Sequence, residues 1–324
     1  RILLAAPTGR AAKRMTEIIG LEAKTIHRLL EYNPVESSFG YNADKQLETD
    51  LLIIDEVSMI DTFLMYNLVI AIDDRTTVIF VGDVDQLPSI GPGNVLHDMI
   101  NSKLIPCVNL TKIFRQAEES KIIMAAHAIN KGMFPRLNEP RTDFVFIEEE
   151  DVNNVVEKIR ELSCNILPQK YKYNLGDHIQ ILSPMYRGEI GVNNINYLLQ
   201  EEFNKNEFAF QFGDKKYKID DKVMQLRNNY DKGIFNGDIG FIHSYEREEH
   251  KVRVSFDGKI VDYDFAELDE ITLAYAVTVH KSQGSEYPCV IMPLSTAHYI
   301  MLQRNLVYTA ITRASKLLIM VGTK

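Results

Sequence analysis

The sequence predicts an α/β protein of two parallel-sheet domains, with a small antiparallel β module inserted in the second domain. Aliphatic runs without polar alternation, such as residues 51–54 and 179–182, are typical of strands buried on both faces. Stretches with helical spacing of apolar residues separate these runs, as in a strand-helix series. From about residue 212 to 268 short alternating runs replace the helical pattern, with turn signals at Asn236-Gly237 and Asp257-Gly258.

Composition sets the frame for function. The chain has 324 residues, of which 45% are hydrophobic and 25% charged, which is enough for two globular domains with their own cores. No apolar run reaches membrane-spanning length and no secretory leader is evident, so no membrane partner is expected. The three cysteines are scattered and predict neither a disulfide framework nor a zinc site, which fits a reducing cytoplasm. The net charge of -9 argues against a globally basic nucleic-acid binder, so any nucleic acid would lie in a local groove.

Two acidic residues, Asp55 and Glu56, follow the strand predicted at residues 51–54. Ligands bind at the carboxyl edge of open α/β sheets. Two carboxylates at that edge suit one role, in which Asp55 holds a magnesium ion and Glu56 polarises a water molecule. The alternative is a surface acidic pair that ends a core strand, and the stretch alone does not decide between the two.

A second buried strand, expected at Val78 to Val81, delivers Gln86 to the same edge through an acidic turn. A glutamine beside a nucleotide γ-phosphate can orient the attacking water or sense the phosphate. Taken separately, this segment reads as an ordinary acidic turn.

The chain opens with Arg1 and a buried-strand pattern at residues 2–6, without an initiating Met, so we expect it to enter a domain part-way through. The turn Pro7-Thr8-Gly9-Arg10 leads into a helix on which Ala11, Ala12, Met15, Ile18 and Ile19 share one face and which Gly20 ends. The amino end of that helix could hold a backbone phosphate of a nucleic acid. An ordinary strand-turn-helix is the alternative.

Thr25 begins a short helix that carries His27, and residues 31–50 turn polar, which predicts a loop or small hairpin. A lone histidine in such a place is more often a structural hydrogen-bonding group than a ligand contact. Arg115 lies beyond the last strand of the first domain, where an arginine is usually a solvated charge or a carboxylate partner. We expect the domain boundary near residue 118.

The second domain supplies two further polar segments. The strand at 179–182 ends in Ser183-Pro184, and Thr278 to Glu286 forms a polar loop rich in donors that is suited to gripping phosphates. We expect Arg313 to lie on a helix, and the alternative to a functional role is an ordinary solvated side chain.

These segments resemble the motifs of superfamily-1 helicases. Asp-Glu and Gly-Asp-x-Asp-Gln-Leu-Pro look like motifs II and III, Ala-Pro-Thr-Gly-Arg-Ala-Ala like motif Ia, and Thr-Ile-His-Arg-Leu-Leu like the next DNA-contacting motif. Phe-Arg-Gln matches the family's arginine pattern, Thr-x-His-Lys-Ser-Gln-Gly-x-Glu matches motif V, and Tyr-Thr-Ala-x-Thr-Arg matches motif VI. Together, from Pro7 to Arg313, they resemble the RecD-like 5′→3′ family that includes exodeoxyribonuclease V alpha subunits.

The resemblance implies two RecA-like domains, 1–118 and 119–324, the first incomplete at its amino end and carrying a pin-like insertion at about 31–50. It also implies an SH3-like barrel at about 212–268. ATP and Mg²⁺ are the implied cofactors, with Asp55 as the metal ligand. The implied catalytic residues are Asp55, Glu56, Gln86, Arg115 and Arg313, and the implied nucleotide contacts are Asp55, Gln86, Arg115, Gly284, Glu286 and Arg313. The implied DNA contacts are Pro7, Thr8, Arg10, Thr25, His27, Ser183, Pro184, Thr278, His280 and Lys281.

The function implied is an ATP-dependent helicase or translocase that moves 5′→3′ on single-stranded DNA in repair or recombination. Its expected partners are single-stranded DNA, duplexes with a 5′ overhang, and subunits of a helicase/nuclease complex. The alternatives are an ATPase-inactive nucleic-acid-binding subunit and a phosphate-loop NTPase that acts on something other than DNA. No Gly-x-x-x-x-Gly-Lys-Ser/Thr loop occurs in the sequence, so we expect that loop upstream of Arg1 and expect residues 1–324 alone to be inactive.

Overall fold

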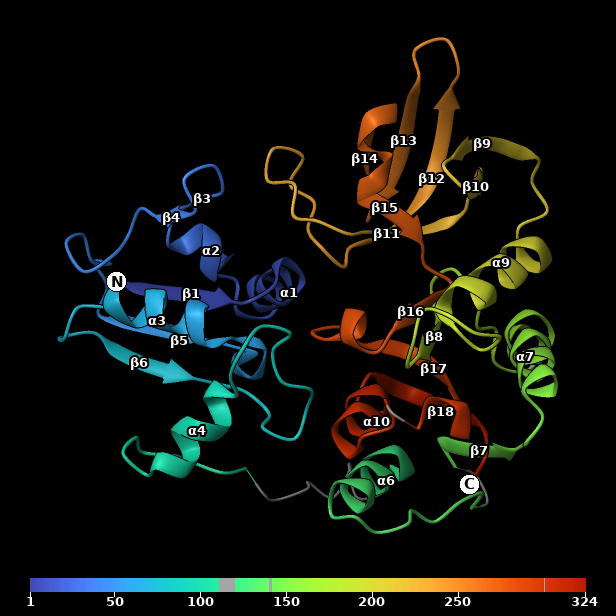
Figure 1. The fold of residues 1–324 in the computed structure, drawn as a ribbon, viewed down its shortest axis with the longest axis horizontal. Helices are drawn as coiled ribbons and strands as arrows, with labels where there is room; N and C mark the ends of the chain where they lie inside the picture. Colours follow the sequence, from blue (N-terminus) through green and yellow to red (C-terminus); the bar gives the residue numbers. More distant parts are fainter. Residues whose placement is uncertain (111–119, 140–141, 300) are drawn as a thin grey trace. The chain divides into compact units, whose positions relative to one another are not determined.

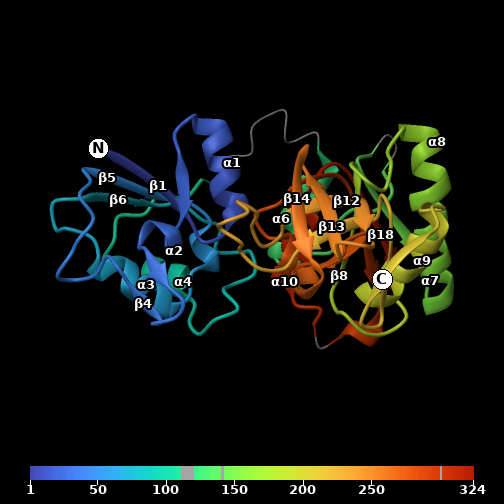
Figure 2. The ribbon, with the colours of Figure 1, turned by 90° about the horizontal axis from the view of Figure 1, so that it is seen from above.

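A computed structural model describes residues 1–110, 120–139, 142–299 and 301–324. The chain divides into two compact units, Arg1–Lys112 and Ile113–Lys324, and each is described by itself. The boundary predicted near residue 118 falls outside the described residues, as does Arg115. Figures 1 and 2 show the first unit in blue to teal and the second in green to red.

The first unit is built on a four-stranded parallel sheet in the order β2-β1-β5-β6. The strands are β1 (Ile2–Ala6), β2 (Ala23–Thr25), β5 (Leu51–Ile54) and β6 (Thr77–Phe80). One face of this sheet packs on the unit's hydrophobic core, which includes Leu52, Ile54 and Leu68. The predicted parallel-sheet class is therefore confirmed for this unit.

The strand expected at 78–81 was wrongly predicted to be a buried strand. Alternate positions along β6 are exposed, with Ile79 at 45% and Val81, just beyond the strand, at 46%. The reason is that β6 is the last strand in the order of the described sheet and only its other face contacts the core, through Val78 and Phe80.

Helices connect the strands of the first unit, and side chains start three of them. They are α1 (Gly9–Ile19), α2 (Ile26–Leu29), α3 (Thr62–Ile70) and α4 (Val95–Ser102). Thr8, Thr25 and Asp61 accept hydrogen bonds from the first turns of α1, α2 and α3, which satisfies amides that have no partner within the helix. α1 ends at Gly20 as predicted, with φ 76, but Ile18 and Ile19 are exposed rather than sharing the buried face.

A small hairpin whose strands have two residues each follows α2, within the segment predicted as a loop or small hairpin. β3 (Tyr32–Asn33) pairs with β4 (Ser38–Phe39) in the antiparallel sense. The ring centroids of Tyr32 and Phe39 lie 4.9 Å apart, and the ring centroid of Phe39 lies 6.2 Å from that of Phe63 on α3. These aromatic contacts anchor the hairpin to the core of the first unit.

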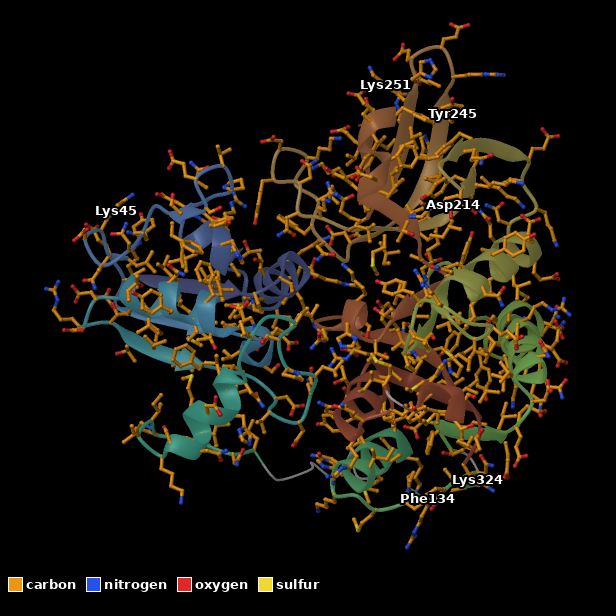
Figure 3. The ribbon with its side chains drawn as sticks, in the orientation of Figure 1. Lys45, Phe134, Asp214, Tyr245, Lys251 and Lys324 are labelled. Atoms are coloured by element: carbon orange, nitrogen blue, oxygen red, sulfur yellow. The ribbon has the colours of Figure 1, made fainter. Side chains whose placement is uncertain are left out.

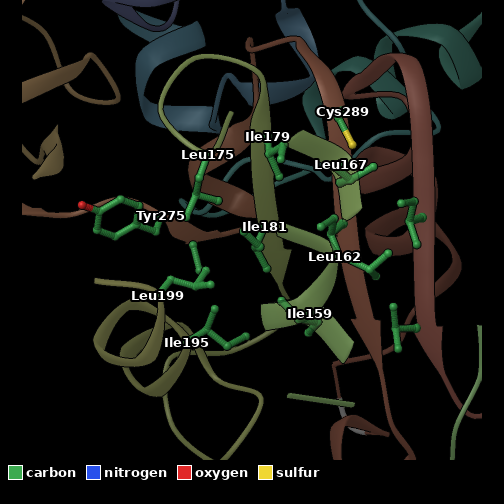
Figure 4. Close-up of a cluster of buried hydrophobic side chains, with 14 of the residues drawn as sticks. Ile159, Leu162, Leu167, Leu175, Ile179, Ile181, Ile195, Leu199, Tyr275 and Cys289 are labelled. Carbon is green, nitrogen blue, oxygen red and sulfur yellow. The ribbon is translucent and has the colours of Figure 1, made fainter. Parts of the chain in front are cut away.

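The second unit contains a five-stranded parallel sheet in the order β16-β8-β17-β18-β7. Its strands are β7 (Phe144–Glu148), β8 (Ile179–Ser183), β16 (Ala276–Thr278), β17 (Tyr287–Leu294) and β18 (Ala314–Gly322). The helices around it are α6 (Lys121–Asn130), α7 (Val152–Glu161), α8 (Leu167–Tyr171), α9 (Val192–Phe203) and α10 (Arg304–Ile311), with a π-helical turn, Leu162–Ile166, between α7 and α8. Figure 4 shows the core beneath α7 and α9, where Ile159, Ile195 and Leu199 meet Ile181 of β8.

The predicted antiparallel module is present between α9 and β16. It holds the hairpin β9 (Phe208–Phe212)–β10 (Lys215–Lys218) and a sheet in the order β14-β13-β12-β11-β15. The strands of that sheet are β11 (Lys222–Gln225), β12 (Ile239–Glu246), β13 (Lys251–Phe256), β14 (Lys259–Asp264) and β15 (Ile271–Leu273). Asp257 and Gly258 both have positive φ, as the predicted primed turn requires. The module has its own core, with Tyr217, Val254 and Tyr263 among its members, and Figure 3 labels Tyr245, which packs against that core, and Lys251.

Asp221 lies where the module joins the parallel-sheet part of the second unit, and it is fully buried. Its carboxylate accepts hydrogen bonds from the side chains of Gln200 and Asn204 on and after α9, from the Tyr275 hydroxyl at 2.9 Å and from the Lys218 amide at 2.6 Å. Burial raises the pKa of Asp221, against the lowering effect of these donors. A carboxylate is the side chain that fits here because it offers acceptors and no N–H of its own.

We predict that Asp221→Asn destabilises the second unit. The amide would turn an N–H₂ toward two of the buried donors and leave them unpaired, so the free energy of unfolding should fall by roughly 1–3 kcal/mol. Urea unfolding followed by circular dichroism measures this. Asp220→Asn is the matched control because Asp220 is an exposed neighbour. Equal stability of the two variants would contradict the role assigned to Asp221.

Candidate nucleotide and nucleic-acid site

The carboxyl ends of the four parallel strands of the first unit bring the predicted site residues to one edge of the sheet. Thr8 follows β1, Thr25 ends β2, Asp55 follows β5, and the segment with Gln86 follows β6. The strand pairing fixes how far along the sheet these residues lie, because Ala5 lies opposite both Lys24 and Ile54. The predicted residues therefore lie at one edge because the strands that precede them all run in the same direction.

Asp55 and Glu56 form a tight turn at this edge. Asp55 Oδ1 accepts a hydrogen bond from the Glu56 amide at 2.8 Å, and the Val57 amide donates to the Val81 carbonyl at 3.0 Å. Glu56 has φ 53 and ψ 40, which is a left-handed conformation that costs a non-glycine residue about 1 kcal/mol or more. Strain of this kind concentrates at functional sites, where the position of a side chain is worth the cost.

Gln86 is held by one end of its amide. Its Nε2 donates to Asp83 Oδ2 at 3.2 Å, while its buried Oε1 has no hydrogen-bond partner within the described part of the chain. An unpaired buried acceptor is costly, so this oxygen is suited to a donor such as a water molecule or hydroxyl that the protein itself does not supply. The role predicted for Gln86 beside a phosphate stays a prediction.

The threonines predicted to contact DNA in the first unit are helix caps. Thr8 Oγ1 accepts from the Ala11 amide at 3.3 Å, and Thr25 Oγ1 accepts from the Arg28 amide at 3.1 Å, with Thr25 only 2% exposed. Pro7 and Arg10 are half-buried beside Thr8. The structure thus gives Thr25 a local structural role. The amino end of α1 is the more accessible candidate surface for DNA.

His27 lies against aromatic rings rather than in open solvent. Its ring meets Tyr32 edge-on at 5.3 Å and lies 6.0 Å from Phe39. Burial lowers the pKa of His27, and the nearby Asp61 carboxylate opposes that shift. A neutral imidazole at physiological pH can hydrogen-bond a nucleic acid but carries no charge toward its phosphates.

In the second unit, Ser183 and Thr278 lie opposite each other at the ends of β8 and β16. Ser183 is fully buried and its hydroxyl donates to the Ile190 carbonyl at 2.8 Å; Thr278 is 4% exposed and its Oγ1 accepts from the Lys281 amide at 3.3 Å. Pro184 is also buried. This placement argues against direct side-chain contacts of these three residues with DNA, because their surfaces are used in shaping the loops that follow the strands.

His280 and Lys281 occupy the 3₁₀ turn His280–Ser282 that follows β16. Burial lowers the pKa of each side chain. Lys281 Nζ donates to Asn236 Oδ1 at 2.8 Å, which links this turn to the loop between β11 and β12. The sequence marked Asn236-Gly237 only as a turn, because nothing local to that dipeptide indicates a contact with a residue 45 positions away.

The nucleotide residues predicted in the second unit lie at the opposite edge of its sheet. Gly284 and Glu286 precede β17 and Arg313 precedes β18, whereas Ser183 and Thr278 end their strands. Since these strands are parallel, the two groups occupy different edges. Arg313 is 6% exposed and donates to the Ser285 carbonyl at 3.1 Å and the Thr309 carbonyl at 3.2 Å.

No group of three or more His, Cys, Asp or Glu side chains that could hold a metal ion occurs among the described residues. Magnesium is commonly held by one or two carboxylates together with phosphates and water, so Asp55 fits such an ion without a cluster. No helix in the described ranges has the length and apolarity needed to cross a membrane.

The fold and the edge residues together define a protein of the helicase class, with two RecA-like parallel-sheet units and a small β module in the second. Three family models match the chain: an AAA domain over residues 1–92, the SH3 domain of ATP-dependent RecD-like DNA helicases over 195–256, and a UvrD-like helicase C-terminal domain over 273–321. The chain belongs to the RecD-like helicase family.

Relatives and solved structures support this assignment. The ATP-dependent RecD2 DNA helicase of Deinococcus radiodurans is 39% identical over 312 residues, which are 96% of this chain and 41% of the relative. The RecBCD enzyme subunit RecD of Buchnera aphidicola (subsp. Schizaphis graminum) is 29% identical and is matched over 65% of its length and all of this chain. The crystal structure of a Bacteroides Pif1 helicase in complex with ADP-AlF3 and single-stranded DNA has the same fold, with a TM-score of 0.61 at 20% identity over 99% of this chain and 82% of that one. The chain thus spans less than two thirds of the length of either of these sequence relatives.

We predict that Glu56→Gly leaves the first unit more stable than Glu56→Ala. Both variants remove the carboxylate, but only alanine keeps a Cβ in the left-handed conformation, so glycine should be favoured by about 1 kcal/mol. Urea unfolding of the two variants side by side measures the difference. A less stable glycine variant would show that the strain read from the backbone at Glu56 is not present in solution.

Proposed function

We propose that this chain is the motor part of an ATP-dependent DNA helicase that translocates 5′→3′ on single-stranded DNA in repair or recombination. The observation that carries the proposal is the single sheet edge of the first unit, where a strained Asp55-Glu56 turn lies alongside the segment with Gln86. Membership of the RecD-like family supports it. Cytoplasmic location is part of the proposal and fits the three free cysteines.

We assign the nucleotide chemistry to the first unit. Bound ATP with Mg²⁺ would supply the phosphoanhydride bond and the charge that offsets its oxygens, and Asp55 would hold the metal. Glu56 accepts a proton from the attacking water, and the unpaired Oε1 of Gln86 orients that water by accepting its second hydrogen. The backbone turn holds the Asp55 carboxylate through the Glu56 amide before substrate binds, so this carboxylate needs little reorganisation for the reaction itself.

Arg313 is assigned to the γ-phosphate as an arginine finger, with Gly284 and Glu286 as further nucleotide contacts. Its guanidinium donates to two carbonyls within the second unit, so reaching a phosphate requires it to exchange those bonds for phosphate oxygens. Exchange of neutral acceptors for an anionic one is favourable for guanidinium. Arg115 keeps the same assignment by sequence alone, since it lies outside the described residues.

Single-stranded DNA is the proposed partner, together with duplexes that carry a 5′ overhang and subunits of a helicase/nuclease complex. The solved Pif1 relative holds single-stranded DNA, and a RecD relative is a RecBCD subunit, which supports these proposals. The accessible candidates for strand contact are the Pro7 to Arg10 turn, His27 and His280. Alternating grip by the two units during ATP turnover would move the strand.

A second candidate function is binding without hydrolysis, in a larger complex. The observation that favours it is that one relative, RecD of Buchnera aphidicola, is a subunit of the RecBCD enzyme. A third, a phosphate-loop NTPase with a target other than DNA, shares the catalytic edge and differs only in what stimulates it.

One measurement separates the three functions. In the full-length protein, single-stranded DNA should stimulate ATP hydrolysis, and Glu56→Gln should lower that stimulated turnover about a hundredfold or more while ATP affinity changes little, because the variant removes only the proton acceptor. Hydrolysis that ignores DNA would identify the unrelated NTPase. Absence of hydrolysis in the wild-type protein, with binding retained, would identify the binding subunit.

We predict that Arg313→Ala in the full-length protein lowers turnover roughly a thousandfold or more, with a smaller effect on ATP affinity, because an arginine finger acts mainly on charge in the transition state. Steady-state hydrolysis with saturating single-stranded DNA measures it. Arg160→Ala is the control, since Arg160 lies on α7 and pairs with Glu157 at 2.7 Å. Turnover of Arg313→Ala within a few-fold of Arg160→Ala would remove Arg313 from the catalytic set.

We also predict that residues 1–324 alone show no magnesium-dependent ATP turnover above background, with or without DNA. The carboxylates are present, but no phosphate loop in this sequence anchors the triphosphate. Phosphate release and calorimetry with ATP test this. Tight ATP binding by residues 1–324 would contradict it and require a different phosphate site.

A further inference from the structure

The loop of residues 226–237, between β11 and β12, is the part of the β module that contacts the 3₁₀ turn after β16. Figure 1 shows this loop in gold, extending beyond the sheet of the module. Its contact with the turn is the hydrogen bond from Lys281 Nζ to Asn236 Oδ1 at 2.8 Å. None of its residues was assigned a role from the sequence.

A continuous set of hydrogen bonds connects Lys281 with the far side of this loop. The Asn236 amide donates to Asn228 Oδ1 at 3.0 Å, and Asn228 Nδ2 lies 3.4 Å from the Tyr230 hydroxyl. The Tyr230 ring meets Phe235 edge-on, with centroids 5.9 Å apart and planes at 70°. The loop is therefore braced from within, and the position of the Tyr230 ring depends on that of Asn236.

The ring at the end of this set is accessible, with Tyr230 46% exposed. The loop's cationic side chains are already occupied by carboxylates: Arg227 pairs with Asp269 at 3.0 Å, and Lys232 pairs with Glu267 at 2.5 Å. A surface with an exposed tyrosine and paired cationic side chains is suited to a nucleic-acid base rather than to phosphate. Base stacking on an aromatic side chain is tolerant of sequence and contributes through the π-face that every base has.

We propose that Tyr230 is a base-stacking contact for single-stranded nucleic acid and that Lys281 is a positioning residue, which holds the loop through Asn236 instead of neutralising a phosphate. The proposal rests on the proposed function, since it deepens how that protein would hold its strand. It also revises the assignment of Lys281 as a direct DNA contact. The half-buried position of Lys281 and the bond of its ammonium to an amide oxygen support that revision.

The salt dependence of binding distinguishes a stacking contact from a phosphate contact. Each phosphate that a protein neutralises on a single strand contributes roughly 0.7 to the slope of log affinity against log salt, whereas stacking contributes nothing to it. Fluorescence anisotropy of the full-length protein with a labelled mixed-sequence strand, over a salt series, gives both the affinity and the slope. We expect Tyr230→Ala to lower affinity roughly 5- to 150-fold with an unchanged slope.

Tyr230→Phe should retain most of the affinity, because stacking uses the ring and not the hydroxyl. A strand with abasic sites should bind wild-type protein more weakly, yet should lose little or nothing further on Tyr230→Ala. Tyr197→Ala is the matched control, since Tyr197 is 60% exposed on α9 and lies outside the loop. We expect it to bind as wild type does.

The role of Lys281 is tested by a double-mutant cycle. Lys281→Met removes the ammonium and keeps most of the aliphatic stem, so it should lower affinity without changing the salt slope. The double variant with Tyr230→Ala should lose much less affinity than the product of the two single fold-losses, because both substitutions act through one ring. Asn236→Asp, which still accepts from Lys281, should bind nearly as wild type, whereas Asn236→Leu should match Lys281→Met.

The outcomes separate this inference from the proposed function. Wild-type protein that fails to bind single-stranded DNA would overturn the proposed function itself. Wild-type binding with Tyr230→Ala equal to Tyr197→Ala would overturn only the stacking contact. A slope that falls by about 0.7 on Lys281→Met, with effects that multiply in the double variant, would return Lys281 to a phosphate contact.

Discussion

Parallel strand pairing is the constraint on which the functional geometry depends. In a parallel sheet every strand ends at the same edge, so the segments that follow β1, β2, β5 and β6 meet although they are far apart in the chain. The same rule divides the second unit, where segments after β8 and β16 lie at one edge and segments before β17 and β18 at the other. A sequence that specifies buried parallel strands has therefore already specified which polar segments can act together.

The β module depends on a different interaction, the buried carboxylate of Asp221. Four donors from α9, the loop after it, Tyr275 and Lys218 converge on one acceptor-only group, which fixes the start of β11 against the segment that leads into β16. Asn196 on α9 strengthens this junction by bonding the backbone of Ala276 in both directions, at 2.8 and 2.9 Å. The module is thus attached through polar groups that are satisfied only in one arrangement, which is what a rigid insertion needs.

The sequence predicted the fold class well and the roles of individual side chains less well, for a physical reason. Strand burial, turn chemistry at Asp257-Gly258 and helix ends such as Gly20 are local, and short-range patterns report them. The exposed face of β6 depends on which strands lie beside it, and no pattern within the strand contains that information. The partner of the Ser183 hydroxyl is likewise not contained in the strand pattern. The resemblance implied a DNA contact for Ser183, whereas its hydroxyl donates to the Ile190 carbonyl.

Arg313 shows how the two kinds of information combine. Motif position indicates a phosphate contact, while the structure shows a guanidinium that donates to the Ser285 carbonyl, just before β17, and to the Thr309 carbonyl on α10. A buried cation without acceptors would be costly, so these carbonyls satisfy Arg313 within its own unit, and the phosphate contact stays a prediction. The segment 279–286 contains Ser285 as well as the turn that carries His280 and Lys281. A continuous stretch of backbone thus connects the candidate nucleotide edge of the second sheet with its candidate nucleic-acid edge.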